Sequence, residues 1–512
     1  MATSTGGSDN KKEGSPFSGF LTYFYGNFVV LLLGFVQTPI VTRLMSTDEY
    51  GRTGMYETAV MIIYIFAVMG LDQAYIRYYY AEGVDRKQLL FRCLMPSVLI
   101  VSVISLIYCF NADIANEFLF GKSGKDITAL VVVYALISVF ERFFFLDIRM
   151  QQNGKLYSNI NIAQKVLALL TIVVAWYFLG NDFRVALYAL AVPWGITTAF
   201  IMIRYYVLGK GDRGDRGTVL LSPSELSKTA DKSDRKETKG PYPCLPYKEL
   251  LRYGVPFIMV LLMEWLLSSC DRLALRTFSD FDELGIYTSA MKIIVLLLTF
   301  KNTFIAYWSP VAMQRFEKYD MEDNRGFFRS AYDLTQFLCV IAATGLILFR
   351  RVIVLLLGPD YRGAERMIPF LTLMPVFAML FEIRVQSIKY SKKNLYLNIA
   401  SLLAIIINIA GNTILVPLWG GVGASVTTGI SYLVYFAGGS FLGERCIKIG
   451  YGIKKTAVYT IMLLLYCTVT TMDVSIWGEA AAGLLILGAA AFIDRKELGV
   501  CIGYVKGFFK HK

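Results

Sequence analysis

Two long apolar segments meet at the sequence DRLALRTFSDFDELGIYTSAMK, which occupies residues 271–292. It begins with Asp271 and Arg272 at the end of one segment, crosses a short polar turn, and ends with Lys292 well inside the next. Charged side chains in or beside segments of membrane-spanning length are costly to bury, so they mark candidate functional sites. What these charges serve is the central question for this chain.

The composition is that of an integral membrane protein. Of 512 residues, 55% are hydrophobic and 18% are charged, and the mean hydropathy is +0.51, whereas soluble chains carry about 25% charged residues. The eight cysteines form no CxxC pair, and the single histidine is His511. We therefore expect no metal site, no cofactor and no histidine-dependent catalysis.

The hydropathy pattern predicts an all-α polytopic membrane protein. A helix needs about 20 apolar residues to cross the bilayer, and about fourteen segments meet that requirement. They are expected at 18–43, 55–79, 89–110, 127–149, 156–178, 184–207, 250–277, 284–308, 329–357, 364–388, 395–417, 421–443, 456–472 and 476–494. Most Lys and Arg residues fall in the tails and the even-numbered loops, which predicts that both termini are cytoplasmic.

The chain divides into two lobes with a charged linker between them. We predict a disordered cytoplasmic tail over 1–16, a six-span N-lobe over 17–207, a disordered cytoplasmic linker over 208–247, a six-span C-lobe over 248–443, two further spans over 444–494 and a cytoplasmic tail over 495–512. Glu49-Tyr50-Gly51 follows the first span, and Glu283-Leu284-Gly285 follows the seventh. Repeated lobes of this kind are typical of transporters whose binding site lies between the repeats.

Basic side chains within and beside the spans are candidates for binding an anionic solute. They are Arg43, Arg52, Arg272 and Arg276 near the predicted outer end, and Lys165, Lys292 and Arg142 deeper in their spans. Snorkelling to the headgroup layer is the alternative explanation for each outer arginine. Lys165 lies roughly 14 Å inside its span at 1.5 Å per residue, which is too deep to snorkel easily. A diphosphate suits such a site, because Arg binds its oxygens in pairs and Lys binds as a point charge.

Three acidic side chains are candidates for ion coupling. Glu264, Asp271 and Asp72 each lie within a span and could take up a proton or Na⁺ in a coupled cycle. For Asp271, an ion pair with Arg272 or Arg276 is the slightly favoured alternative. Glu264 has no partner close in sequence and is the better coupling candidate.

At these residues the sequence resembles the polysaccharide (Wzx-type) flippases. The resemblance rests on short motifs in order along residues 17–450: Pro39, Thr42-Arg43-Leu44, Glu49-Tyr50-Gly51, Gly70-Leu71-Asp72, Arg77-Tyr78-Tyr79, Arg149, Tyr157-Ser158, Asp271-Arg272, Glu283-Leu284-Gly285-Ile286-Tyr287, Ala290 and Lys292. The resemblance implies membership of the MOP superfamily, together with the MATE exporters and the lipid II flippase. The charged linker over 208–247 departs from the family pattern.

The resemblance also implies an architecture and a mechanism. Two six-helix bundles would face each other in a V, followed by two extra helices. The substrate would be an oligosaccharide on an undecaprenyl (di)phosphate carrier, moved by alternating access across the bacterial cytoplasmic membrane. Its head group would cross in a cationic cavity while the lipid tail stays among the membrane lipids. By position, Arg43, Arg52, Arg272 and Arg276 would bind phosphate, and other polysaccharide-assembly membrane proteins would be partners.

Two other functions compete with the flippase. A MATE-like, cation-coupled exporter of small molecules would need acidic residues in the cavity, whereas the deep charges here are mainly basic. A membrane glycosyltransferase could use Asp48 and Glu49 as a catalytic acidic pair, but the predicted outer loops are short and offer no domain to hold an acceptor. The net charge of +12 follows from the positive-inside rule, so we expect no nucleic-acid binding.

Overall fold

The computed structural model describes residues 16–81, 84–151, 153–211, 245–472 and 475–499, and it describes their side chains except at 16–27, 206–211 and 306–307. Within these ranges the chain is helical and contains no strand. The predicted tail 1–16, linker 208–247 and tail 495–512 lie largely outside the described residues. The predicted all-α fold class is confirmed.

Eight helices make up the first half of the chain. They are α1 (Pro16–Leu44), α2 (Thr47–Val68), α3 (Leu71–Tyr78), α4 (Arg86–Phe110), α5 (Ala112–Phe120), α6 (Lys125–Met150), α7 (Gly154–Leu179) and α8 (Arg184–Gly211). They pack mainly against each other, for example α1 on α7, α6 on α8 and α2 on α4. We refer to these eight helices as the N-lobe; the predicted boundary of this lobe at residue 207 stays a prediction.

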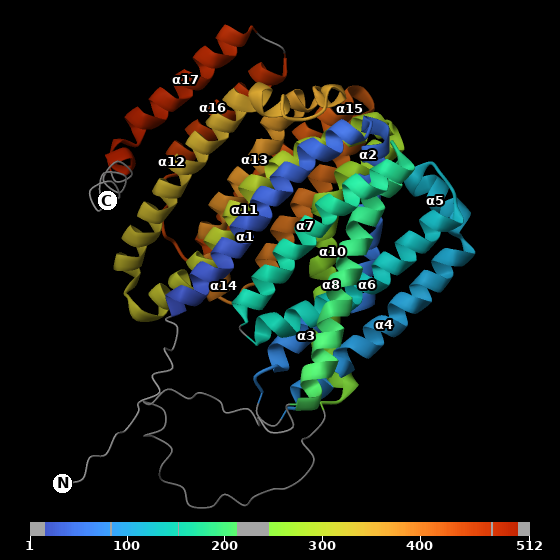
Figure 1. Ribbon diagram of the computed structural model, residues 1–512. Helices are drawn as coiled ribbons and strands as arrows, with labels where there is room; N and C mark the ends of the chain where they lie inside the picture. Colours follow the sequence, from blue (N-terminus) through green and yellow to red (C-terminus); the bar gives the residue numbers. More distant parts are fainter. Residues whose placement is uncertain (1–15, 82–83, 152, 212–244, 473–474, 500–512) are drawn as a thin grey trace, which may run out of the picture.

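The second half begins after the linker. It contains α10 (Tyr247–Phe278), α11 (Phe281–Lys318), α12 (Met321–Val354), η1 (Pro359–Tyr361), α13 (Ala364–Arg384), α14 (Gln386–Tyr390), α15 (Leu395–Cys446), α16 (Ile453–Thr471) and α17 (Ile476–Ile493). Helices α10 to α15 pack together as the C-lobe, while α16 and α17 pack against α12 and α13 at one flank (Figure 1). The two extra helices thus lie beside the C-lobe.

Eleven of the described helices are long and apolar enough to cross a membrane, or twelve if the bent pair α2 and α3 forms one span. That pair bends by 52° at Met69 and Gly70, which both have positive φ. Helix α15 has 52 residues, and its backbone leaves the helical region at Gly420. Because about 20 residues suffice for one crossing, α15 is long enough for two, as the segments 395–417 and 421–443 predict. The count of fourteen stays a prediction.

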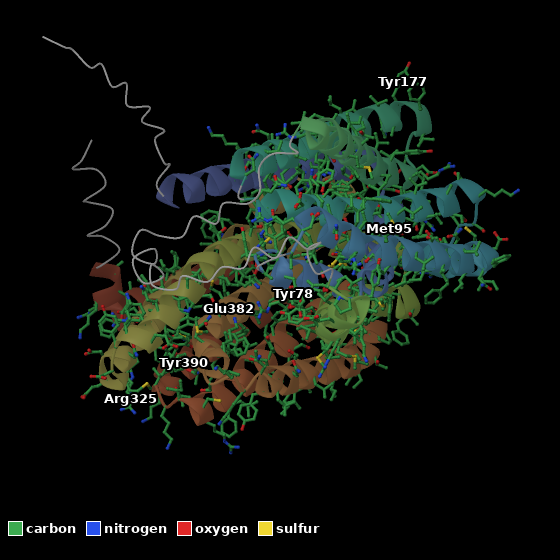
Figure 2. All side chains as sticks on the ribbon, turned by 90° about the horizontal axis from the view of Figure 1, so that it is seen from below. Tyr78, Met95, Tyr177, Arg325, Glu382 and Tyr390 are labelled. Atoms are coloured by element: carbon green, nitrogen blue, oxygen red, sulfur yellow. The ribbon has the colours of Figure 1, made fainter. Side chains whose placement is uncertain are left out.

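The periphery of the bundle is apolar, as a lipid-facing surface requires. Tyr177 on α7 is 79% exposed and points away from the bundle (Figure 2), and Trp477 on α17 is 84% exposed. Most buried apolar residues of the described chain fall in three large clusters, one mainly in each lobe and one that joins the two lobes, and a small fourth cluster lies between α10 and α15. The exposed aromatic and aliphatic side chains are therefore explained by contact with lipid, and they do not indicate a poorly packed core.

The sequence itself specifies the turn between α10 and α11. The Asp280 carboxylate accepts a hydrogen bond from the Glu283 backbone N–H at 2.8 Å, as an N-cap residue does. Asp282 and Glu283 then place negative charge in the first turn, where the helix dipole favours it. The polar centre of the 271–292 stretch thus ends one span and starts the next within two residues.

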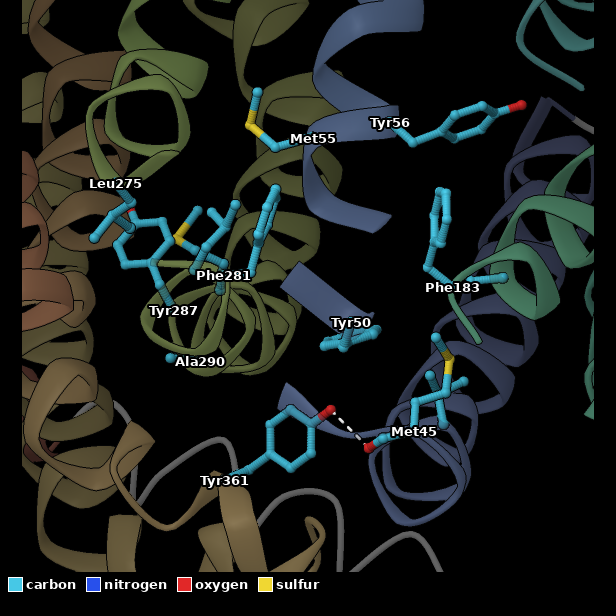
Figure 3. Packing of buried hydrophobic residues seen from close by; sticks show 14 of the residues in the cluster. Met45, Tyr50, Met55, Tyr56, Phe183, Leu275, Phe281, Tyr287, Ala290 and Tyr361 are labelled. Carbon is cyan, nitrogen blue, oxygen red and sulfur yellow. Dashed lines mark hydrogen bonds between the residues drawn. The ribbon is translucent and has the colours of Figure 1, made fainter. Parts of the chain in front are cut away.

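The two lobes meet closely where α2 crosses α11. A Cβ on Gly285 would lie 1.9 Å from the Thr47 carbonyl oxygen, and a Cβ on Gly51 would lie 2.1 Å from the Phe281 carbonyl oxygen. Figure 3 shows Tyr50 beside Phe281 and Tyr361 in this region, which we call the outer seam. Only glycine permits this backbone contact. The repeated motifs 49–51 and 283–285 therefore pack against each other and close the predicted outer end.

Candidate functional site

A cavity of about 900 Å³ lies between α1, α2, α6, α7 and α8 of the N-lobe and α11 of the C-lobe. Its charged and polar lining residues are Gln37, Thr38, Tyr50, Thr53, Glu57, Arg149, Tyr157, Lys165, Lys292, Thr299, Asn302 and Thr303. Tyr50 stands at the outer seam, while Arg149 is exposed at the opposite end, where α6 finishes. The cavity therefore runs from the seam toward the predicted inner face.

Cations outnumber anions on the cavity wall. Lys165 comes from α7, Lys292 from α11 and Arg149 from α6, and Glu57 on α2 is the carboxylate among the lining residues. Two of the cations, Lys165 and Lys292, are sequence-predicted site residues, and the fold brings them to one cavity from different lobes. The wall as a whole favours an anionic guest.

Glu57 links the lobes inside the cavity. Lys292 Nζ donates to Glu57 Oε1 at 2.9 Å, and Arg272 Nη2 lies 3.8 Å from Glu57 Oε2. The charge of Lys165 also acts on this carboxylate. Three of the predicted cations thus surround one acidic side chain.

Sequence reasoning missed Glu57. The signal that could have found it is the repeat: Glu57 follows Gly51 by six residues, and Lys292 follows Gly285 by seven. Because the two glycines touch, each charge lies about 9 to 11 Å beyond the same crossing point at 1.5 Å per residue. Reading the two motifs as a contact would have placed Glu57 opposite Lys292.

The other outer arginines lie at the seam and not on the cavity wall. The guanidinium carbons of Arg52 and Arg276 lie 4.2 and 4.5 Å from the centre of the Phe281 ring. Arg52 also donates to Asp48 and to the Phe120 carbonyl oxygen. Arg276 donates from Nε to the Phe118 carbonyl oxygen at 2.8 Å, and Arg43 is exposed at the end of α1. In this conformation Arg52 and Arg276 hold the outer end together.

Arg142 and Asp72 neutralise each other. Arg142 Nη2 lies 2.5 Å from Asp72 Oδ2, and the Asp72 side chain is buried. Glu141, which is adjacent to Arg142 in sequence, accepts instead from Gln164 at 3.2 Å. The pair joins α3 to α6 within the N-lobe and lies away from the cavity wall.

Asp271 is buried in a neutral hydrogen-bond network. One carboxylate oxygen accepts from Tyr287 and Thr428, both at 2.6 Å. The other accepts from Asn408 at 3.1 Å and Asn412 at 2.8 Å. The favoured ion pair with Arg272 or Arg276 was therefore wrong: these arginines reach Glu57 and α5, and four neutral donors serve Asp271 instead.

Glu264, the other coupling candidate on α10, does not line the cavity. Its side chain is exposed on α10, outside the cavity wall, and the charge of Lys301 on α11 acts on it. Among the described residues no group of three His, Cys, Asp or Glu side chains could hold a metal ion.

A cavity with several charged lining residues thus lies between two groups of membrane-length helices. The structure is similar to the lipid II flippase MurJ in its inward closed conformation, with a TM-score of 0.62, 13% identity, and coverage of 94% of this chain and 99% of that chain. It is also similar to an inward-facing multidrug resistance MATE family transporter, with a TM-score of 0.57, 18% identity, and coverage of 86% and 99%. The family described as polysaccharide biosynthesis protein matches residues 17–316, and the chain belongs to that family.

These findings confirm the family and the fold expected from the motifs along residues 17–450. A third similar structure is a MOP superfamily transporter from Pyrococcus furiosus, with a TM-score of 0.53, 16% identity, and coverage of 85% and 97%. A comparison with curated proteins gave no match. At these identities the likeness shows the fold alone, and the function has to be argued from the cavity.

Proposed function

We propose that this protein is a flippase that moves an undecaprenyl-(di)phosphate-linked oligosaccharide from the cytoplasmic to the outer leaflet for surface polysaccharide synthesis. The observation that carries the proposal is the cavity between the lobes, whose wall presents Lys165, Lys292 and Arg149 against one carboxylate. Two phosphates would be held by these cations at a depth where water competes weakly. Membership of the polysaccharide biosynthesis family supports the same substrate class.

The neutral part of the wall suits the sugar. Gln37, Asn302 and Thr303 line the cavity and offer both donors and acceptors to hydroxyl groups. A volume of about 900 Å³ is comparable to that of other ligand pockets. The lipid tail would remain in the bilayer, since the apolar carrier gains nothing by leaving it.

The closed end of the cavity, at the contact of α2 with α11, indicates how alternating access would work. The glycine contact of α2 with α11 seals the predicted outer end, and Arg149 stands at the predicted inner end. The head group would bind from the cytoplasm, and parting of the outer seam would release it outside. This orientation assumes a bacterial cytoplasmic membrane protein with both termini in the cytoplasm, as its charge distribution predicts.

Asp271 is the ion-coupling candidate that the structure favours. Its carboxylate is 2% exposed and contacts α11 and both halves of α15, so a change of its charge would alter several helices at once. We propose that it takes up a proton or Na⁺ during the cycle. Asp72 is the weaker candidate because Arg142 already compensates its charge.

The alternative, a MATE-like exporter of small cations, shares the fold. The polarity of the wall argues against it, because three cations would repel a cationic drug. Cation-stimulated drug efflux from vesicles, without any effect on lipid-linked sugars, would establish the exporter.

The test combines a cellular and a reconstituted assay. Deleting the gene is expected to leave a lipid-linked oligosaccharide on the cytoplasmic leaflet, and purified protein in liposomes should translocate that same lipid. Replacing Lys165 and Lys292 together by Ala should lower translocation by at least about tenfold, since two charge-assisted contacts are lost. Lys454→Ala, at an exposed position of α16, is the matched control. Normal translocation by the double variant would refute the proposed site.

A further inference from the structure

The pair Glu57 and Lys292 has an unusual setting for an ion pair. The two side chains are 28% and 33% exposed, and both line the cavity. An ion pair buried in protein is inaccessible to a competitor, whereas this one faces the space that a ligand would occupy. A phosphate group entering the cavity can reach Lys292 directly.

Like a phosphate group, Glu57 is negatively charged, and its oxygens accept hydrogen bonds from cationic donors. Its two carboxylate oxygens face Lys292 and Arg272, at 2.9 and 3.8 Å, in the way that two phosphate oxygens would. With the cavity empty, two or three uncompensated cations at this depth would be strongly unfavourable. The carboxylate removes part of that cost.

The same pair spans the two lobes. Glu57 belongs to α2 of the N-lobe, while Lys292 and Arg272 belong to α11 and α10 of the C-lobe. Lys165, on α7, and Arg149, on α6, are cations that the N-lobe contributes to the same wall. An anion bound between Lys165 and Lys292 would replace one link between the lobes with another.

We propose that Glu57 is a built-in counter-ion that occupies the cation site of the empty cavity and is displaced by the anionic head group of the substrate. This inference deepens the proposed function and rests on it for the identity of the substrate. Displacement makes binding weaker than the cations alone would allow, and it gives the site an internal anion that helps to expel the head group after translocation. Glu57 is thus a residue that sets affinity and release.

The experiment measures binding by the full-length protein in lipid nanodiscs. The probes are geranylgeranyl diphosphate, which carries a lipid tail, and inorganic pyrophosphate, which does not. Glu57→Gln should bind both probes roughly tenfold more tightly than the wild type, because a competing negative charge is removed from the site. Its translocation rate should fall, since release is slowed.

Two variants control for charge and for folding. Glu117→Gln makes the same side-chain change in the same lobe, at an exposed position of α5 off the cavity wall, and its Kd should match the wild type. Glu57→Asp keeps the charge on a shorter side chain, so its Kd should lie between those of the wild type and Glu57→Gln. If Glu57→Gln does not fold, Glu57→Asp carries the test.

Unchanged or weaker binding by the Glu57 variants would overturn the counter-ion role. A wild type that translocates lipid-linked oligosaccharide, together with an unchanged Kd in Glu57→Gln, rejects this inference but leaves the flippase standing. Tighter binding by Glu57→Gln, together with no translocation of lipid-linked oligosaccharide by the wild type, supports the counter-ion role and rejects the flippase.

Discussion

The outer seam makes a quantitative prediction about alternating access. In Gly285→Ala the new Cβ would lie 1.9 Å from the Thr47 carbonyl oxygen and 2.7 Å from its carbonyl carbon. Both partners are helical backbone, so neither can rotate away as a side chain would. The helices must separate by about 1 to 1.5 Å to restore an ordinary contact, and overpacking of this kind costs about 1–3 kcal/mol.

That cost falls only on the conformation in which the seam is closed. The variant should therefore shift the equilibrium between closed and open seams by roughly 5- to 150-fold toward the open one. Electron paramagnetic resonance distances between spin labels report this shift. Suitable positions are Lys125 at the start of α6 and Asp360 in η1, both exposed near the predicted outer end. The labels would be placed in a background without the native cysteines.

The control is Gly345→Ala on α12, where an added Cβ would have no atom within 4 Å. It makes the same change in helix propensity and should leave the distance distribution unchanged. If Gly285→Ala gave the wild-type distribution and the wild-type thermal stability, the seam would not be a gate, and the argument from the glycine contact would fail.

Three further predictions follow from other contacts. Arg350→Met removes a cation that lies 2.8 Å from Glu479, and both side chains are nearly fully buried. The variant should lose about 3–5 kcal/mol of folding free energy, measured as a lower Tm in detergent. A Tm equal to that of Arg351→Met would contradict this expectation. Asp271→Asn should fold but lose the dependence of translocation on an H⁺ or Na⁺ gradient, measured in liposomes, and an unaltered dependence would exclude Asp271 from coupling. Deleting 212–238, which lies outside the described residues, should leave translocation intact, whereas complete loss would assign the linker a role.

Hydropathy and charge determined much of the architecture from the sequence alone. Runs of apolar residues must become helices in a membrane, because every backbone polar group needs an internal partner there. The turn at Asp280 was equally predictable, since capping depends on residues that are adjacent in sequence. The depth of Lys165 and Lys292 in their spans pointed to the cavity wall on which both are found.

The pairing of charges was decided by the tertiary structure. Asp72 pairs with Arg142, 70 residues away, and Glu57 with Lys292, 235 residues away. Helices that are apolar on all sides carry no pattern that tells which face meets which neighbour, so the partner of a charge depends on packing that hydropathy does not encode. For the same reason Asp271, which two arginines follow in sequence, accepts hydrogen bonds from Tyr287 and three α15 side chains in the fold. The sequence thus determined the helices and the depth of their charges, and the packing of the two lobes determined which charges face the cavity.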